Sequence, residues 1–103
     1  MAEPHHRNIL VLLDGTVGEG NVTIFNNKNV FFYPASSEQT VTITFCEGVP
    51  FSNWDGRSTM TGEKGKPLKG KVDSRATGEF PYNPGSIACT GERANPKLIV
   101  DGG

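Results

Sequence analysis

The sequence predicts a single all-β domain, and three observations carry that prediction. Glycine and proline, with 13 and 7 residues, make up a large part of the 103-residue chain, and both interrupt helices. No window of eleven residues free of glycine and proline keeps the helical spacing of apolar side chains. Residues 40–45 alternate strictly between threonine and apolar residues, as in a strand with one buried face. We therefore expect about seven short strands in a β-sandwich.

The first half of the chain contains four of the expected strands. Residues 9–13 form a continuous apolar run that ends at the turn-forming residues 14–16. Residues 22–25 and 30–33 are separated by three asparagines and a lysine, so these two segments can form a hairpin. Residues 40–45 follow as the most clearly patterned strand, whose apolar side chains point inward.

The second half of the chain is richer in turn signals. Residues 57–78 contain most of the lysines, and a segment of this length predicts one or two short irregular strands, such as residues 69–72. Residues 80–82 are typical of an edge strand, because Pro81 has no N–H for a ladder hydrogen bond, and residues 87–89 can extend it. Residues 97–101 form the last strand.

Length and charge exclude several classes of function. Ten basic residues oppose 11 acidic ones, so a net charge of −1 gives no general attraction to nucleic acid or to an anionic membrane. The longest apolar run is five residues, residues 9–13, whereas a membrane span needs about 20. The run is also too short for the apolar part of a signal peptide. We expect no nucleic-acid partner, no membrane span, and a location that is either cytoplasmic or exported after removal of a signal.

The chain length fits one domain, residues 1–103, with residues 1–8 as a flexible terminus. We expect a monomer. Catalytic dyads and triads that use histidine cannot be assembled, because the two histidines, His5 and His6, both lie in the terminal segment before the first expected strand. We therefore expect that the protein is not an enzyme.

From residue 22 onward, the order of the segments resembles the cupredoxin family, the Greek-key β-sandwiches of the plastocyanin and azurin type. The resemblance covers about residues 22–101. The features that carry it are VFFYP at residues 30–34, TVTITF at residues 40–45, Asn53-Trp54, and GEFPY followed by KLIVD near the C-terminus. The resemblance implies a cupredoxin-like Greek-key sandwich.

The sequence departs from the family at the residues that would hold type 1 copper. Such a site takes two imidazoles, one thiolate and usually a weak axial thioether. No histidine follows His6. Aligning residues 80–82 with the family's aromatic pair puts the cysteine position near Pro84. Aligning Cys89 instead puts the histidine position near Glu92 and the methionine position near Asn95, so neither alignment yields a ligand set. The resemblance therefore implies the fold without type 1 copper, and we expect no cofactor.

Cys46 and Cys89 are the two cysteines of the chain. In a cupredoxin-like sandwich both lie toward the same end, so a disulfide between them is one interpretation and two buried, unreactive thiols are the other. A third hypothesis is a copper-binding or electron-transfer protein that uses non-standard ligands from His5, His6, Cys46 and Cys89. An amino-terminal copper clamp is disfavoured, because Pro4 has no amide proton.

Two groups of residues are candidates for binding a partner. Lys64, Lys66, Lys69 and Lys71 lie in residues 57–75, where six basic and two acidic residues give +4 and leave −5 for the remainder. This segment can attract an acidic partner protein or a polyanion, or it can be a solvated loop. Phe51 and Trp54 can form a small aromatic contact patch, or they can pack in the core.

Residues 65–72 match the first part of a phosphate-binding loop, but Val72 stands where the motif needs serine or threonine, and no helix signal follows. We therefore do not expect a nucleotide-binding site here.

We expect a small bacterial-type cupredoxin-like binding or structural module whose partner is another protein. A generic immunoglobulin-like interaction domain is a further alternative. Strand order separates the two folds, because the cupredoxin-like order requires the last strand to run parallel to a strand from the N-terminal half.

Overall fold

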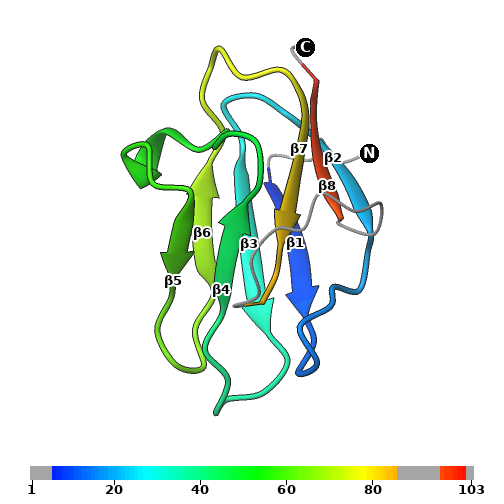
Figure 1. Ribbon diagram of the computed structural model, residues 1–103, viewed down its shortest axis with the longest axis vertical. Coiled ribbons are helices and arrows are strands. Elements are labelled where there is room, and N and C mark those ends of the chain that lie inside the picture. The colour runs from blue at the N-terminus through cyan, green and yellow to red at the C-terminus, as the bar shows by residue number, and fades with distance from the viewer. Residues whose placement is uncertain (1–5, 86–95, 102–103) are drawn as a thin grey trace.

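The computed structural model describes residues 6–85 and 96–101, which form eight strands and one short 3-10 turn, η1. Figure 1 shows their arrangement. No helix in these two ranges is long and apolar enough to cross a membrane. In chain order the elements are β1 (His6–Val11), β2 (Asn21–Phe25), β3 (Asn29–Pro34), β4 (Thr42–Phe45), η1 (Ser52–Trp54), β5 (Thr59–Thr61), β6 (Leu68–Lys71), β7 (Gly78–Asn83) and β8 (Lys97–Asp101).

The strands form two sheets, which overlap in the view of Figure 1. One is three-stranded with the order β1-β3-β6, and the other is five-stranded with the order β2-β8-β7-β4-β5. Each sheet contains one parallel pair, β1 with β3 and β2 with β8. The last strand thus runs parallel to a strand from the N-terminal half, which confirms the predicted cupredoxin-like order.

Four predictions about the elements need correction. Residues 80–82 are not an edge strand, because β7 is paired with β8 on one side and with β4 on the other. The hairpin between residues 22–25 and 30–33 is wrong, because β2 and β3 belong to different sheets. The chain crosses between the sheets at Asn27, whose φ of 67° is left-handed, a conformation that asparagine tolerates. The first strand begins at His6 rather than at residue 9, so residues 6–8 are not a flexible terminus. Residues 87–89 lie outside the described part of the chain.

The core lies between the two sheets and is filled by the inward-facing residues of each strand. Burial of side chains of this size is worth about 1.5–3 kcal/mol each. Five aromatic rings meet at its centre, with ring centroids 4.9 to 6.2 Å apart. The rings are those of Phe32, Phe45, Phe51, Trp54 and Tyr82.

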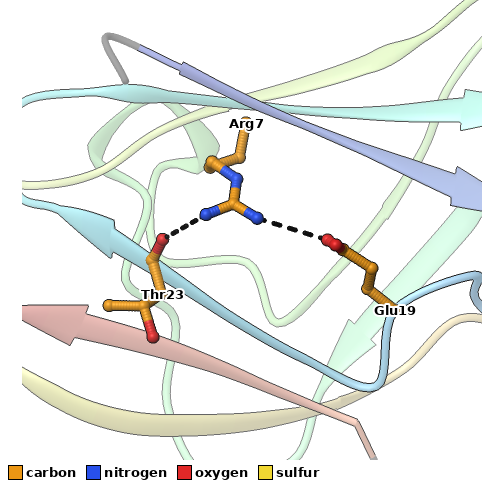
Figure 2. A network of polar contacts seen from close by, with 3 residues as sticks. All are labelled: Arg7, Glu19 and Thr23. Atoms are coloured by element: carbon orange, nitrogen blue, oxygen red, sulfur yellow. Dashed lines mark hydrogen bonds and ion pairs between the residues drawn. The ribbon is translucent and has the colours of Figure 1, made fainter. Parts of the chain in front are cut away.

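Arg7 joins the two sheets at the side where β1 lies next to β2 (Figure 2). Its Nη1 donates a hydrogen bond to the Thr23 carbonyl at 3.0 Å, and its Nη2 lies 3.3 Å from Glu19 Oε1. The ion pair is partly exposed, so we expect it to contribute at most about 1 kcal/mol. Its main effect is to hold the side of the sandwich closed.

Candidate functional site

A cavity of about 240 Å³ lies at one end of the sandwich, and we call it the end cavity. Its walls come from three segments: the turn after β1, the loop between β3 and β4, and the residues that follow β7. The lining residues are Val11, Leu12, Leu13, Gly15, Gln39, Thr40, Thr42, Pro84 and Gly85. One of the two alignments that the resemblance allows puts the copper cysteine of the cupredoxins near Pro84, and for that alignment this cavity is where a type 1 site would be sought. In the other alignment the cysteine is Cys89, which lies outside the described residues.

Gln39 connects two of these three walls. Its Oε1 accepts a hydrogen bond from the Ala35 backbone N–H at 2.6 Å. Its Nε2 donates to the backbone carbonyls of Val11 and Leu12 at 3.0 and 3.3 Å. Both ends of the amide therefore bond to the backbone, and the side chain fixes the β3–β4 loop against the end of β1.

Asp14 stabilises the turn after β1, which forms one wall of the end cavity. Its Oδ1 accepts hydrogen bonds from the Thr16 hydroxyl at 2.7 Å and from the Thr16 backbone N–H at 3.0 Å. These bonds stabilise the charged carboxylate, so they lower the pKa of Asp14 below its usual value, with the Thr16 hydroxyl as the largest cause. The carboxylate thus stabilises the turn in which Gly15 adopts a φ of 86°.

The described side chains of the end cavity do not fit type 1 copper. Pro84 is buried and its side chain has no donor atom. Thr40 and Thr42 offer only hydroxyls, and the Thr42 hydroxyl lies 3.1 Å from that of Thr61. Copper in such sites requires thiolate and imidazole ligands. Within residues 6–85 and 96–101, no group of three or more His, Cys, Asp or Glu residues could hold a metal ion.

The structure does not bring together the described members of the alternative ligand set. The His6 ring lies on the three-stranded sheet and contacts the Phe31 ring edge-on, with centroids 5.7 Å apart. Cys46 follows β4 of the other sheet, where its N–H donates to the Pro81 carbonyl at 2.9 Å. His5 and Cys89 lie outside the described residues.

The Cys46 sulfur is disulfide-bonded. Cys89 is the only other cysteine in the sequence, but it falls in the part of the chain that the structure does not describe. The Cys46–Cys89 disulfide therefore stays a prediction.

Phe51 and Trp54 are core residues rather than a contact patch. They are only 2% and 1% exposed, and their ring centroids are 4.9 Å apart. The Trp54 indole Nε1 donates to the Lys69 carbonyl at 3.1 Å, which satisfies its one polar group. The structure thus corrects the hypothesis of an aromatic patch here, because η1 folds its apolar side chains inward against Phe45.

The four candidate lysines fall into two separate pairs. Lys64 and Lys66, in the loop between β5 and β6, lie 3.1 Å from Glu38 and 3.5 Å from Glu63. Lys69 and Lys71 lie on β6 and are exposed. The Nζ of Lys69 lies over the Phe31 ring, 5.9 Å from its centroid.

The outer surface of the three-stranded sheet carries apolar residues that the sequence analysis did not single out. Leu10 and Tyr33 are 45% and 38% exposed, and Phe31 is partly exposed between them and β6. The signal was present in residues 30–33, where four apolar residues in one strand must leave two on the outside. We call this surface the aromatic face; its outward residues are His6, Asn8, Leu10, Phe31, Tyr33, Lys69 and Lys71.

No protein-family model and no curated protein matches the sequence. Among solved structures, a mutant of amicyanin with Cu(I) superimposes with a TM-score of 0.59 at 12% identity, over 97% of this chain and 86% of that chain. A copper-binding protein in its apo form superimposes with a TM-score of 0.52 at 15% identity, over 98% and 93% of the two chains. Such low identities concern the fold alone. The two superpositions, together with the two parallel strand pairs, show that this chain has the Greek-key sandwich fold of the cupredoxins.

Proposed function

We propose that this chain is a cupredoxin-like binding or structural module that acts by contact with another protein and not through type 1 copper. Similarity to copper proteins supports the fold part of this proposal and does not carry ligands over to this chain. The function therefore has to be argued from the residues of the end cavity and of the surface.

The observation that carries the proposal is that Pro84 and Gln39, neither of them a thiolate or imidazole ligand for type 1 copper, both line the end cavity. In one of the two alignments that the resemblance allows, Pro84 stands near the position of the copper thiolate, and proline cannot bind a metal through its side chain. Gln39, in the neighbouring wall, has both ends of its amide bonded to backbone groups. Gln39 therefore has a structural use in this cavity, since its side chain holds the β3–β4 loop against the end of β1.

Catalysis does not form part of the proposal. His6, the histidine that the structure describes, packs against Phe31 and not against a nucleophile. An immunoglobulin-like domain is not favoured either, because β8 runs parallel to β2 as the cupredoxin-like order requires. The aromatic face remains as a surface with apolar and basic side chains together.

A copper titration tests the proposal. The full chain is titrated separately with Cu(I) and Cu(II), with the cysteines oxidised and then reduced, while absorption and the mass of the native protein are recorded. We expect no intense thiolate-to-copper band in the visible range. A stable one-to-one complex with such a band would overturn the proposal and favour the ligand set His5, His6, Cys46 and Cys89. Repeating the titration with His6→Ala and Cys89→Ser would then identify the ligands.

Free-thiol counting under native and denaturing, non-reducing conditions complements the titration. We expect no free thiol, because Cys46 is disulfide-bonded. Two free thiols would contradict the disulfide and would keep both sulfurs available to a soft metal ion.

A further inference from the structure

We infer that the aromatic face is the docking site for an extended, acidic segment of a partner protein, in which an apolar side chain lies next to carboxylates. This inference rests on the proposed function, because it gives the binding module its surface and its class of partner. It is argued from the apolar residues of the face, its charge, and the closure of the neighbouring sheet edge.

The apolar part of the face lies across β1 and β3. The register pairs Leu10 with Tyr33 and Asn8 with Phe31, so these side chains stand side by side on two hydrogen-bonded strands. The Phe31 and Tyr33 rings lie next to each other, with centroids 6.2 Å apart. Exposed tyrosine and phenylalanine grouped in this way are typical of the centre of a protein interface.

A shallow depression lies in this part of the face. Its volume is about 380 Å³, and its lining residues are Asn8, Leu10, Tyr33 and Pro34. Three of these four side chains are largely apolar, so an apolar side chain of a partner would gain by entering it. Such a side chain is worth about 1.5–3 kcal/mol when it is fully buried.

The basic part of the face lies on β6. The register pairs Phe31 with Lys69 and Asn29 with Lys71, so Lys69 borders the Phe31 ring and Lys71 follows on the same face, opposite Asn29. Among the described residues, none of those that point outward from this sheet is an aspartate or a glutamate. Lys64 and Lys66, by contrast, have carboxylates beside them. The face is therefore complementary to an acidic partner and not to a basic one.

The spacing of the two parts suits an extended segment. Lys69 is paired with Phe31, which lies two residues before Tyr33 on β3. Two residues along a strand span about 7 Å and neighbouring strands lie about 5 Å apart, so the depression and the Lys69 ammonium are separated by roughly 8–10 Å. An apolar residue and a carboxylate two positions apart in an extended chain point to the same side, about 7 Å apart, and the reach of their side chains covers this distance.

The edge of β6 is not open for strand addition. The Asn53 side chain accepts from the Lys71 N–H at 2.9 Å and donates to the Lys69 carbonyl at 3.2 Å. A partner strand at this edge would have to displace it. The partner is therefore expected to contact the face through side chains.

Fluorescence anisotropy with three labelled peptides of nine residues tests this inference. The first peptide repeats two aspartates followed by two leucines, so that on each side of the extended chain a leucine lies two positions from an aspartate. The second peptide has lysine for each aspartate, and the third has serine for each leucine. The protein is used as wild type, as Lys69→Glu/Lys71→Glu, and as Lys64→Glu/Lys66→Glu, which makes the same change of net charge away from the face. A Leu10→Ser/Tyr33→Ser variant tests the depression, and a Lys69→Gln/Lys71→Gln variant serves if the glutamates impair folding.

We expect only the first peptide to bind appreciably. The Lys69→Glu/Lys71→Glu variant should weaken it about tenfold or more, which corresponds to about 1.4 kcal/mol, and Leu10→Ser/Tyr33→Ser should weaken it by a similar factor. The Lys64→Glu/Lys66→Glu control should stay within about twofold of the wild type. Amide shifts in NMR spectra should change along β1, β3 and β6.

Several outcomes would overturn the inference. They are no binding at millimolar peptide, an equal loss in the two lysine variants, or shifts that avoid the aromatic face. Tighter binding of an oligothymidylate or of phosphatidylserine vesicles than of the first peptide would assign the face to another class of partner. A positive copper titration with intact peptide binding would reject only the proposed absence of copper, so the two failures are distinguishable.

Discussion

The Asn53 side chain caps the edge of the three-stranded sheet by pairing with Lys71. Its Oδ1 accepts a hydrogen bond from the Lys71 backbone N–H at 2.9 Å, and its Nδ2 donates to the Lys69 carbonyl at 3.2 Å. The side-chain amide thus takes the place of the peptide group of a neighbouring strand. An edge strand with unpaired backbone groups tends to pair with another chain, so this cap protects the domain from association.

We expect Asn53→Ala to lower the free energy of unfolding by about 1–2 kcal/mol, because two hydrogen bonds at an exposed site are lost. The variant should also associate at high protein concentration through β6. Urea denaturation measures the first effect and sedimentation velocity the second.

Ser52→Ala is the matched control, because the Ser52 hydroxyl lies 3.5 Å from the Lys71 carbonyl and makes a weaker contact with the same strand. It should stay monomeric and close to the wild type in stability. Equal behaviour of the two variants would contradict a special role for the Asn53 amide.

Sequence patterns were sufficient where each strand buries one face. The alternation in residues 40–45 corresponds to β4 (Thr42–Phe45), and residues 97–101 are β8. The pattern could not show that β2 and β3 belong to different sheets, because a turn-forming tetrad is compatible with both a hairpin and a crossover. Sheet membership depends on pairing between distant segments, such as β2 with β8, which local patterns do not encode.

The candidate site could be predicted only in part. That Pro84 itself offers no donor atom was visible in the sequence, because ligand chemistry depends on residue type. The bonds of Gln39 were not, since a single glutamine in a loop forms no pattern. The sequence alone could not show whether Phe51 and Trp54 are buried or exposed, because an aromatic side chain in a turn-rich segment can pack in the core or lie on the surface.

Gly70 leaves room for the Phe51 ring, and we expect Gly70→Ala to disturb the core. A Cβ at this position would lie within 2.5 Å of Phe51 Cε2, and that ring is held between Phe45 and Trp54. Overpacking of this kind typically costs about 1–3 kcal/mol. Chemical denaturation should show this loss.

Gly62→Ala is the control for Gly70→Ala. A Cβ at residue 62 would come no closer than 3.4 Å to Leu68, an ordinary contact. We expect only a small change in its free energy of unfolding. Adding Phe51→Leu to Gly70→Ala should cost less than the sum of the two single variants, since the clash disappears; strict additivity would show that the ring is not responsible.

Gln39→Ala should destabilise the domain by about 1–3 kcal/mol, because it leaves the partly buried Val11 and Leu12 carbonyls and the Ala35 N–H without this partner. Hydrogen exchange of the Ala35 amide should become faster in this variant. Gln39→Glu retains the acceptor for Ala35 but places an oxygen against both carbonyls, so at neutral pH it should not restore stability. A Gln39→Glu variant as stable as the wild type would show that the Nε2 contacts contribute little.

Thr16→Ala should raise the pKa of Asp14 toward its usual value of 3.8, because the Thr16 hydroxyl is the largest cause of its lowering. The Thr16 N–H still donates to Asp14, so part of the lowering should remain. In the wild type the folded-state pKa lies below the unfolded one, so the stabilisation is present above about pH 4 and is lost as the pH falls through the folded-state pKa. NMR titration of the Asp14 carboxyl in the wild type and in Thr16→Ala gives the two folded-state pKa values to compare. Identical pKa values in the two proteins would contradict the role of the hydroxyl.

Tyr82 should make the domain sensitive to alkali. Burial raises the pKa of its hydroxyl well above the ordinary value of 10.0, and the charge of Glu19 adds to this. Because the folded-state pKa is the higher one, the stabilisation is complete below about pH 10 and is lost as the pH rises toward the folded-state pKa, by up to about 1.4 kcal/mol per pH unit.

Tyr82→Phe removes this ionisation while it keeps the ring in the core. Urea denaturation at pH 9, 10 and 11 should show that the wild type loses more stability over this range than the variant does. Deprotonation of lysines affects both proteins alike, so the difference between the two curves isolates Tyr82. Glu19→Gln should lessen the difference slightly, since Glu19 is the smaller cause. Parallel curves for the wild type and Tyr82→Phe would show that the buried hydroxyl does not govern alkaline unfolding.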